Sequence, residues 1–564
     1  MSNIDWTVLI FTLFAVVAYG VFIGRGQKSN ASYLKADNKM PWYIVLLGIM
    51  ATQASAITFL SAPGQAYTDG MRFVQYYFGL PLAMIVICIT FIPIFQKLNV
   101  YTAYEYLENR FDKKTRVLTS LLFLFSRGLS TGISIYAPSI ILSSVLNWNI
   151  YLTNILTGGI LLIYTYVGGA KAIAHTQKLQ FLIILGTMAF AGYLLIQHMP
   201  DGIGFKDALY LAGKSGKLNV ITTEFDWKDK YNIWSGLIGG FFLALSYFGT
   251  DQSQVGRYIT AKDNTNAKMG LLLNGLVKIP MQFAILLIGA LLFAFFSLKP
   301  APIYFNERSY QYLKEKEPRQ AAAFEKEHNA LQKQFTQQSH QILAEKEKQS
   351  PLLNASIADF KSTQNKVKDL HTRVEEAINQ SNYNAEKTDT NYLFLYFVKN
   401  TLPVGMVGLL FAVIFLASWG SISAALNSLA ACSLKDVHLI FGAEAPDDET
   451  ELKYSRLHTL AWGIFSIAVA MFATQMGSLI EAVNVLGSLF YGPILGIFLV
   501  AFYFKKIDGP LVFISAILAE IVVIAVYKFD IISFLWLNVI GAAAVIAFSL
   551  LGLLFHKPKV VLGE

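Results

Sequence analysis

The chain has 564 residues, of which 54% are hydrophobic and only 15% are charged, and its mean hydropathy is +0.47. A soluble protein of this length would consist of several domains joined by polar linkers, whereas apolar stretches fill most of this chain. The formal charge of +8 does not indicate a nucleic-acid partner, because the basic residues fall in short loops between apolar stretches. Cys88 and Cys432 both lie inside such stretches, which argues against a disulfide framework or a zinc site. We expect an all-α polytopic membrane protein embedded in a lipid bilayer.

Apolar stretches of bilayer-spanning length recur along the whole chain. The first has no basic leading segment and no small-residue cleavage site, so we expect it to be retained as a leading transmembrane helix within residues 1–30. Counting the stretches predicts about 13 transmembrane spans. They are residues 6–24, 42–66, 73–96, 117–146, 150–168, 178–197, 232–255, 269–297, 393–432, 457–475, 479–504, 510–528 and 532–555.

Basic residues mark alternate loops and predict the orientation. The loop after the first span contains Arg25, Lys28, Lys35 and Lys39. The positive-inside rule places this loop in the cytoplasm and the N-terminus outside. With an odd number of spans the C-terminus is cytoplasmic, where Lys557 and Lys559 follow the last span. We therefore expect a multi-pass protein of the cell membrane, that is, a plasma or inner membrane.

One long segment, residues 299–391, does not have membrane composition. It is rich in Lys, Glu, Gln and Asn and contains helix-forming stretches such as QAAAFEKEHNALQKQF. We expect an extracellular or periplasmic helical insertion. It could dock a partner protein or cover an entrance, or it could be a solvated insertion tolerated in a surface loop.

The span at Trp42–Tyr67 contains polar residues in its middle, which suits lipid poorly. Small residues and Pro63 lie beside these polar residues, so the helix could be interrupted there, and unpaired carbonyls at membrane depth are tolerated only where they line a cavity. Such carbonyls can bind a cation. A continuous packed helix, with hydroxyls bonded to the preceding turn, is the alternative. The polar residues are Thr52, Gln53, Ser55, Thr58 and Ser61.

Three further places carry polar groups inside apolar stretches, where each indicates a cavity, a helix contact or a functional site. The sequence FFLALSYFGTDQSQVGRY contains Asp251 and predicts a second interrupted helix, although Asp251 could also be only a helix cap. Lys278 lies about nine residues inside its span and either faces a cavity or snorkels to the cytoplasmic end. The stretch LASWGSISAALNSL presents a face of serines and small residues, which permits close helix packing or completes an oxygen shell for a monovalent cation.

The motifs TQASAITFLSAPGQAY, NVYTAYEYLENRF, YTYVGGAKAIAHTQ, YFGTDQSQVGRYITAK and SISAALNSLA occur in this order along the chain. In this order they resemble the sodium:solute symporter family, which includes sodium-coupled carriers of sugars, proline, iodide, vitamins and sialic acid. The resemblance covers residues 6 to about 556, apart from 299–391.

This resemblance implies a leucine-transporter-type fold of two inverted five-helix repeats. The first repeat would occupy 40–200, and the second 230–298 and 392–506. Residues 507–564 would form two trailing helices and a short cytoplasmic tail. The implied activity is secondary active transport: symport of a small organic solute, a sugar or an organic anion, with Na⁺ as coupling ion. No enzymatic activity is implied.

The resemblance also implies site residues, carried over by aligned position. A sodium site would use the carbonyls of Ala51, Ala54 and Ala417, the hydroxyl of Ser421, and the residue at position 420. Solute would lie near Gln53, Thr58, Gln75, Lys278 and Asn484, with Tyr247 as the inner gate. Residues Gln177, Lys178 and Asp251 would take part in coupling.

Two positions depart from the family pattern. Many relatives have Ser or Thr at position 420 and an acidic residue at position 177, whereas this chain has Gly420 and Gln177. A carboxylate contributes charge to a sodium site, but an amide contributes only a dipole. One alternative is therefore a proton-coupled or ion-independent carrier in which the Lys178 ammonium takes the place of the ion. Another is a solute sensor that does not transport. Residues 175–180 could also simply form a solvated loop.

Overall fold

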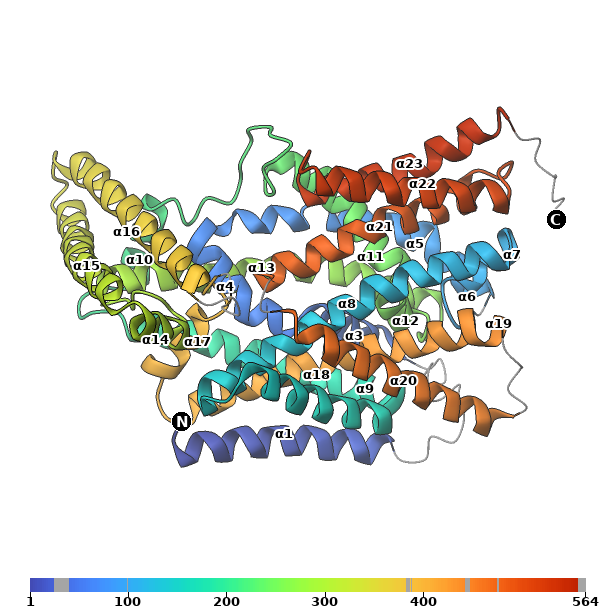
Figure 1. The fold of residues 1–564 in the computed structure, drawn as a ribbon, viewed down its shortest axis with the longest axis horizontal. Helices are drawn as coiled ribbons and strands as arrows, with labels where there is room; N and C mark the ends of the chain where they lie inside the picture. The colour runs from blue at the N-terminus through green and yellow to red at the C-terminus, as the bar shows by residue number, and fades with distance from the viewer. Residues whose placement is uncertain are drawn as a thin grey trace.

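The computed structural model describes residues 1–24, 40–98, 100–381, 386, 388–441, 447–473 and 476–555, without the side chains of 21, 23–24 and 167–172. These residues form helices, joined by loops and by one isolated β-bridge between Met40 and Ala261 (Figure 1). The basic residues of the first loop, 25–39, and of the tail, 557 and 559, lie outside the described residues, so the orientation in the membrane stays a prediction.

The first half of the chain supplies one side of the helical body. Its elements are α1 (Asn3–Gly24), α3 (Trp42–Gln53), α4 (Ala56–Asp69), the 3₁₀ helix η2 (Met71–Tyr77), α5 (Leu80–Ile89), α6 (Phe91–Leu98), α7 (Glu105–Arg110), α8 (Lys113–Leu146), α9 (Ile150–Gln197) and α10 (Phe205–Lys214).

The second half begins with the π-helical turn η3 (Ser235–Gly239). Then follow α11 (Gly240–Thr250), α12 (Gln252–Tyr258), α13 (Asn264–Leu298), α14 (Glu307–Lys316), α15 (Pro318–Glu347), α16 (Leu353–Ser381), α17 (Leu393–Thr401), α18 (Met406–Cys432), η4 (Ser433–His438), α19 (Leu439–Phe441), α20 (Asp448–Ala470), α21 (Leu479–Tyr503), α22 (Gly509–Lys528) and α23 (Phe534–Gly552).

Membrane-spanning helices dominate the described residues. Nine helices there are long and apolar enough to cross a membrane, or ten if α3 and α4 are counted as one broken span, and Ile150–Tyr166 and Ser235–Thr250 are shorter apolar helices. Residue 3 lies toward the end of the molecule that carries α14–α16, and α23 ends at the opposite end (Figure 1). An odd number of crossings would produce this arrangement, and the predicted count of about 13 stays a prediction.

The helix α9 contains two of the predicted spans. Residues Tyr164 and Thr176 share a hydrogen bond of 2.7 Å between their hydroxyls. In a straight α-helix, twelve residues span about 18 Å. Tyr164 and Thr176 are therefore closer than a straight helix allows, as expected if the two parts are separate spans.

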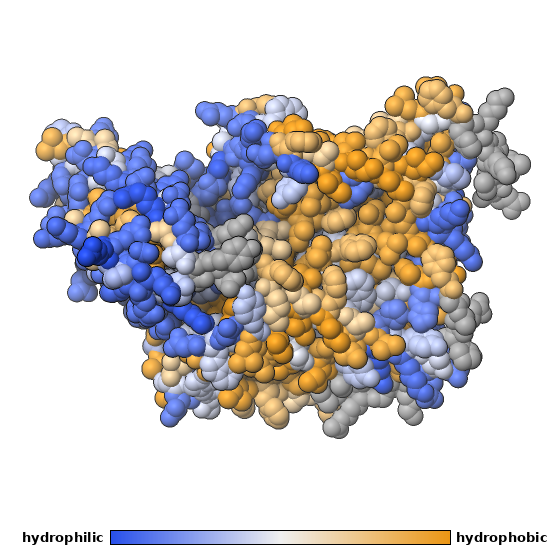
Figure 2. Space-filling view, in the orientation of Figure 1, coloured by the Kyte–Doolittle hydropathy of each residue, from blue (hydrophilic) through white to orange (hydrophobic). Residues whose placement is uncertain are grey.

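The described part of the insertion at 299–391 is helical, and α15 and α16 form a hairpin. Its long helices α15 and α16 pack together, with the rings of Phe335 and Phe360 stacked at a centroid distance of 4.7 Å. Figure 2 shows hydrophilic residues over this hairpin and a broad hydrophobic surface over the middle of the body. The hairpin therefore projects from a body with a membrane-type surface.

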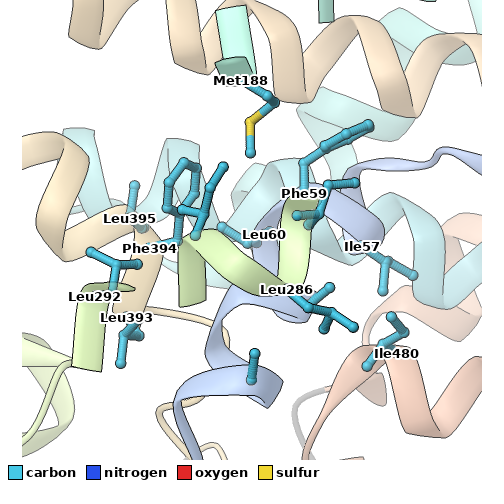
Figure 3. Close-up of a cluster of buried hydrophobic side chains, with 14 of the residues drawn as sticks. Ile57, Phe59, Leu60, Met188, Leu286, Leu292, Leu393, Phe394, Leu395 and Ile480 are labelled. Carbon is cyan, nitrogen blue, oxygen red and sulfur yellow. The ribbon is translucent and has the colours of Figure 1, made fainter. Parts of the chain in front are cut away.

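The second half of the first broken span, α4, belongs to the buried core beside the insertion. Residues Ile57, Phe59 and Leu60 of α4 pack in one buried cluster with side chains of α9, α13, α17 and α21 (Figure 3). Because α17 directly follows the insertion, this cluster connects the insertion to the helices around α4.

Candidate functional site

The first predicted interruption is present between α3 and α4. The two helices are bent by 58°, and Ala54 leaves the helical region, with φ −82° and ψ 65°. The Thr58 hydroxyl donates to the carbonyl of Gln53 across the break, at 3.3 Å. The last carbonyls of a helix have no N–H partner in a following turn. The break between α3 and α4 therefore leaves carbonyls that are not bonded within a helix.

The second interruption is at Asp251, between α11 and α12. Asp251 is extended, with φ −74° and ψ 116°, and caps α12 by accepting from the backbone N–H of Ser253 at 2.8 Å. Its other carboxylate oxygen accepts from the Tyr491 hydroxyl at 2.8 Å. The two functions we considered for Asp251, cap and helix break, are therefore both present.

A cavity of about 120 Å³ lies between the two broken helices. The break between α3 and α4 and the α11 half of the second broken helix contribute to its walls, and α13 and α21 close its sides. Five of the six residues predicted to surround a solute line this cavity, namely Gln53, Thr58, Tyr247, Lys278 and Asn484.

Hydrogen bonds hold three of these side chains in place. The Gln53 amide donates to Asn274 at 2.7 Å, Asn484 accepts from the Tyr76 hydroxyl at 3.1 Å, and the Tyr247 hydroxyl accepts from Gln254 at 2.6 Å. The polar groups that face the cavity are therefore positioned by neighbouring helices before any solute arrives.

Lys278 is 1% exposed and lines the cavity, so its side chain does not snorkel to the surface. Its ammonium lies 5.3 Å from the centroid of the Tyr77 ring. Within the described residues it forms no ion pair. A buried ammonium with no carboxylate partner is costly unless a bound group supplies the charge.

A second cation in the cavity wall, Arg127 of α8, did not enter our sequence expectations. It is 9% exposed and interacts electrostatically with Asp251. The sequence does contain a signal for Arg127, because an arginine ten residues inside the predicted span 117–146 is costly in hydrocarbon and marks a functional position.

Gln75 is the one predicted solute residue that the structure does not bring to the cavity. Its amide donates to the carbonyl of Tyr231 at 2.8 Å and accepts from the N–H of Thr222 at 3.0 Å. The side chain thus fixes the connection before η3.

Gln177 joins the end of α3 to α18, the two helices predicted to hold a cation. The amide nitrogen of Gln177 donates to the carbonyl of Gly420 at 2.8 Å and to the hydroxyl of Thr52 at 3.3 Å. One nitrogen thus bonds both helices, at residues adjacent in sequence to the predicted ligands Ala51 and Ser421. The Ser421 hydroxyl donates to the carbonyl of Ala417, at 3.1 Å.

The residues around Gln177 do not form a solvated loop. Gln177 is 0% and Gln180 1% exposed. Lys178 instead points away from α18, with its ammonium 5.6 Å from the centroid of the Tyr43 ring. Tyr43 and Ala51 are eight residues apart on α3, about 12 Å along the helix axis, so the structure does not bring Lys178 to the candidate cation site.

The model of the sodium:solute symporter family matches residues 33–307 and 375–518, which is well over half of the chain. The chain belongs to the sodium:solute symporter family. The family match leaves out 308–374, the main part of the helical hairpin. The protein is therefore a sodium-coupled solute transporter of the membrane, and not an enzyme.

Known proteins are similar over nearly the whole chain. The sodium/sialic acid symporter NanT of Aliivibrio fischeri is 24% identical over 97% of this chain and 92% of its own length. The human sodium-coupled monocarboxylate transporter 1 is 31% identical over 48% of this chain and 44% of its own length. A solved substrate-bound, outward-open structure of a Na⁺-coupled sialic acid symporter has a TM-score of 0.76 at 22% identity, with 99% of this chain and 100% of that chain covered. This likeness confirms the leucine-transporter-type fold.

Proposed function

We propose that the protein carries a small organic anion, such as a carboxylic or sugar acid, into the cell together with Na⁺. The observation that supports this proposal is the charge of the cavity wall. It contains Arg127 and Lys278 and no carboxylate among its described lining residues. Asp251, which is not among the cavity-lining residues, interacts electrostatically with Arg127, so Lys278 is the cation whose charge a solute carboxylate would balance. The relatives named for sialic acid and monocarboxylate transport handle acids, which agrees with this charge.

The side chains around the cation site suit Na⁺. The carbonyls of Ala51, Ala54 and Ala417 and the hydroxyl of Ser421 are neutral oxygen groups of the kind that bind Na⁺ at broken helices. When bound, the ion would join α3 to α18 and so favour one arrangement of the two halves. Solute transport is coupled to the ion to the extent that both prefer the same arrangement.

The aromatic side chains beneath the cavity suit the inner gate. Tyr247 and Tyr491 lie with ring centroids 5.9 Å apart, and the Tyr491 hydroxyl is bonded to Asp251. Release of the solute to the cytoplasm would require Tyr247 to leave this position as one helix bundle rocks against the other.

The repeat boundaries and the orientation belong to the same proposal. Residues 40–200 would be the first inverted repeat, and 230–298 with 392–506 the second. Residues 1–30 and 507–564 would add one leading and two trailing helices in the cell membrane. The N-terminus and the 299–391 insertion would be outside and the C-terminus in the cytoplasm.

Uptake into proteoliposomes tests the choice of solute. Panels of sugars, sugar acids, amino acids, monocarboxylates and vitamins, each with its neutral counterpart, would be offered with external NaCl or choline chloride. We expect an acid to enter and its amide or reduced alcohol to be excluded. Transport of the neutral member alone would overturn the anion proposal, and equal uptake in NaCl and choline chloride would overturn the coupling.

A variant of Lys278 tests whether its ammonium recognises the solute. Lys278→Met keeps the apolar stem and should raise the half-saturating concentration of the acid at least tenfold, because a charge-assisted bond contributes about 1.5–3 kcal/mol. Lys528→Met, at the end of α22, is the matched control. If Lys278→Met bound the acid as tightly as the wild type, Lys278 would have no part in recognition.

A further inference from the structure

Gln180 of α9 is a buried amide without a hydrogen-bond partner. It is 1% exposed, and neither its Oε1 nor its Nε2 atom has a partner within the described residues. Leaving buried donors and acceptors unpaired costs about 1–3 kcal/mol each. Such a group in a native interior calls for an explanation, and a bound ion is one.

The Gln180 side chain occupies the space beside Gly420. A Cβ atom placed on Gly420 would lie 2.7 Å from Oε1 of Gln180, closer than real Cβ contacts. The next nearest atom, Cγ of Gln177, would be at an ordinary 3.5 Å. The glycine at 420 and the position of the Gln180 oxygen therefore depend on each other.

The contacts of the neighbouring residue Gln177 indicate that Oε1 of Gln180 lies at the level of the cation site. The amide nitrogen of Gln177 already bonds the Gly420 carbonyl and Thr52, and its own Oε1 has no partner within the described residues. Gln177 thus holds α3 against α18 as a hydrogen-bond donor, which a carboxylate could not do.

We propose that Oε1 of Gln180 is a ligand of the bound cation, in place of the hydroxyl that a serine or threonine at position 420 would supply. This proposal rests on the cation site of the proposed function and names one of its ligands. The site then consists of neutral oxygens only, from helix carbonyls, the Ser421 hydroxyl and the Gln180 amide. The bound cation is then held by the dipoles of these oxygen groups, without a carboxylate at position 177.

Sodium binding without solute tests the ligand directly. The purified protein would be titrated with NaCl against choline chloride at constant ionic strength, and thermal unfolding would be recorded. Gln180→Met keeps the length of the side chain and removes both orphaned atoms. We expect it to unfold at the same or a higher temperature without Na⁺, and to need about tenfold more Na⁺ for the same stabilisation.

A compensating pair separates ligation from packing. Gly420→Ser alone should weaken sodium binding, because its Cβ meets Gln180. Gln180→Ala with Gly420→Ser removes that contact and restores a hydroxyl, so this pair should bind Na⁺ more tightly than Gln180→Ala alone. The control Gln282→Met removes another buried amide of which both polar atoms lack described partners, on α13, and should keep the wild-type sodium dependence.

The outcomes distinguish this proposal from the function on which it rests. If Gln180→Met binds Na⁺ like the wild type while Ser421→Ala does not, the Gln180 side chain only fills space and the ligand proposal is wrong. The same holds if the Gly420→Ser pair does no better than Gln180→Ala. If the wild type is not stabilised by Na⁺ at all, the cation site itself is wrong.

Discussion

The Tyr491 hydroxyl of α21 donates a 2.8 Å hydrogen bond to the Asp251 carboxylate, at the residue that separates α11 from α12. Within the described residues, the other hydrogen bonds to this carboxylate come from the N–H and hydroxyl of Ser253. The broken helix is therefore joined to α21 through this bond and through the Ser246 hydroxyl of α11, which donates to the Tyr491 carbonyl at 2.6 Å.

Tyr491→Phe removes that bond and leaves part of a buried carboxylate without a donor. We expect the free energy of unfolding to fall by about 1.5–3 kcal/mol, the range for hydrogen bonds to charged groups. Thermal unfolding in detergent measures it, with Tyr527→Phe on the half-exposed face of α22 as control. An unchanged unfolding temperature would show that Asp251 does not depend on Tyr491.

Ser421→Ala should reduce sodium-dependent uptake more than it reduces expression, because it removes a cation ligand and leaves a common packing residue. Ser428→Ala is the matched control, since the Ser428 hydroxyl makes the corresponding bond to the carbonyl four residues earlier, at 2.9 Å. The comparison is uptake at low and high NaCl, normalised to protein in the membrane. Equal loss of uptake and expression would make Ser421 a packing residue.

Lys178→Ala should leave the sodium dependence of uptake within about twofold of the wild type, because the ammonium lies over Tyr43 and a cation–π contact at a partly exposed site is worth about 0.5–1 kcal/mol. The measurement is uptake across a NaCl series. A variant that gains or loses sodium dependence would support the alternative in which the lysine replaces the ion.

Gly64→Ala should disturb the contact between α4 and the end of the insertion. A Cβ on Gly64 would lie 2.0 Å from the carbonyl oxygen of Thr390, and backbone cannot yield as a side chain can. We expect a cost typical of overpacking, about 1–3 kcal/mol, seen as a lower unfolding temperature. Gly186→Ala, where a Cβ meets nothing within 4 Å, is the control. Equal behaviour of the two variants would mean that the insertion end adapts freely.

The base of the insertion should become less stable as the pH rises. Burial raises the pKa of Glu386 to about 7 and nearby Asp389 raises it further, against the lowering effect of the hydrogen bond from the Tyr392 hydroxyl. Because the folded protein then holds this proton more tightly than the unfolded chain, stability falls between about pH 4.5 and 7. Burial likewise raises the pKa of Glu375 to about 7.

Glu386→Gln is expected to reduce the drop in unfolding temperature between pH 5 and 7.5, with Glu375 and His371 accounting for the remainder. Asp389 raises the pKa of His371 from 6.5 to about 9 against the effect of burial, so the contribution of His371 is lost progressively between these two pH values. Thermal unfolding of wild type and variant at both pH values is the measurement. An equal drop in the two proteins would show that Glu386 is solvated.

Much of the architecture could be predicted from the sequence. The apolar runs located the spans because hydrocarbon admits few other segments, and polar residues at Thr52–Thr58 and at Asp251 located both helix breaks. Composition alone identified the insertion as a polar helical hairpin, since a segment with so little apolar surface has no place in the bilayer.

The individual site residues could be predicted less completely. Five of the six predicted solute residues line the cavity. The Gln75 side chain instead forms hydrogen bonds with backbone groups of a distant loop, and no local sequence pattern reveals such a contact. Arg127 was detectable by its depth in the span. The position of Gln180 was not, because it depends on an absent side chain at Gly420 across a helix interface.

The last residue of the insertion, Asn391, is bonded both to α4 and to the residues before α21. Asn391 accepts from the Ser61 hydroxyl of α4 at 2.7 Å and donates to the carbonyl of Gly477, just before α21. A displacement of α4 during the transport cycle has to carry this junction along or break it. A binder that holds α15 and α16 would therefore slow the transport cycle without entering the solute pathway.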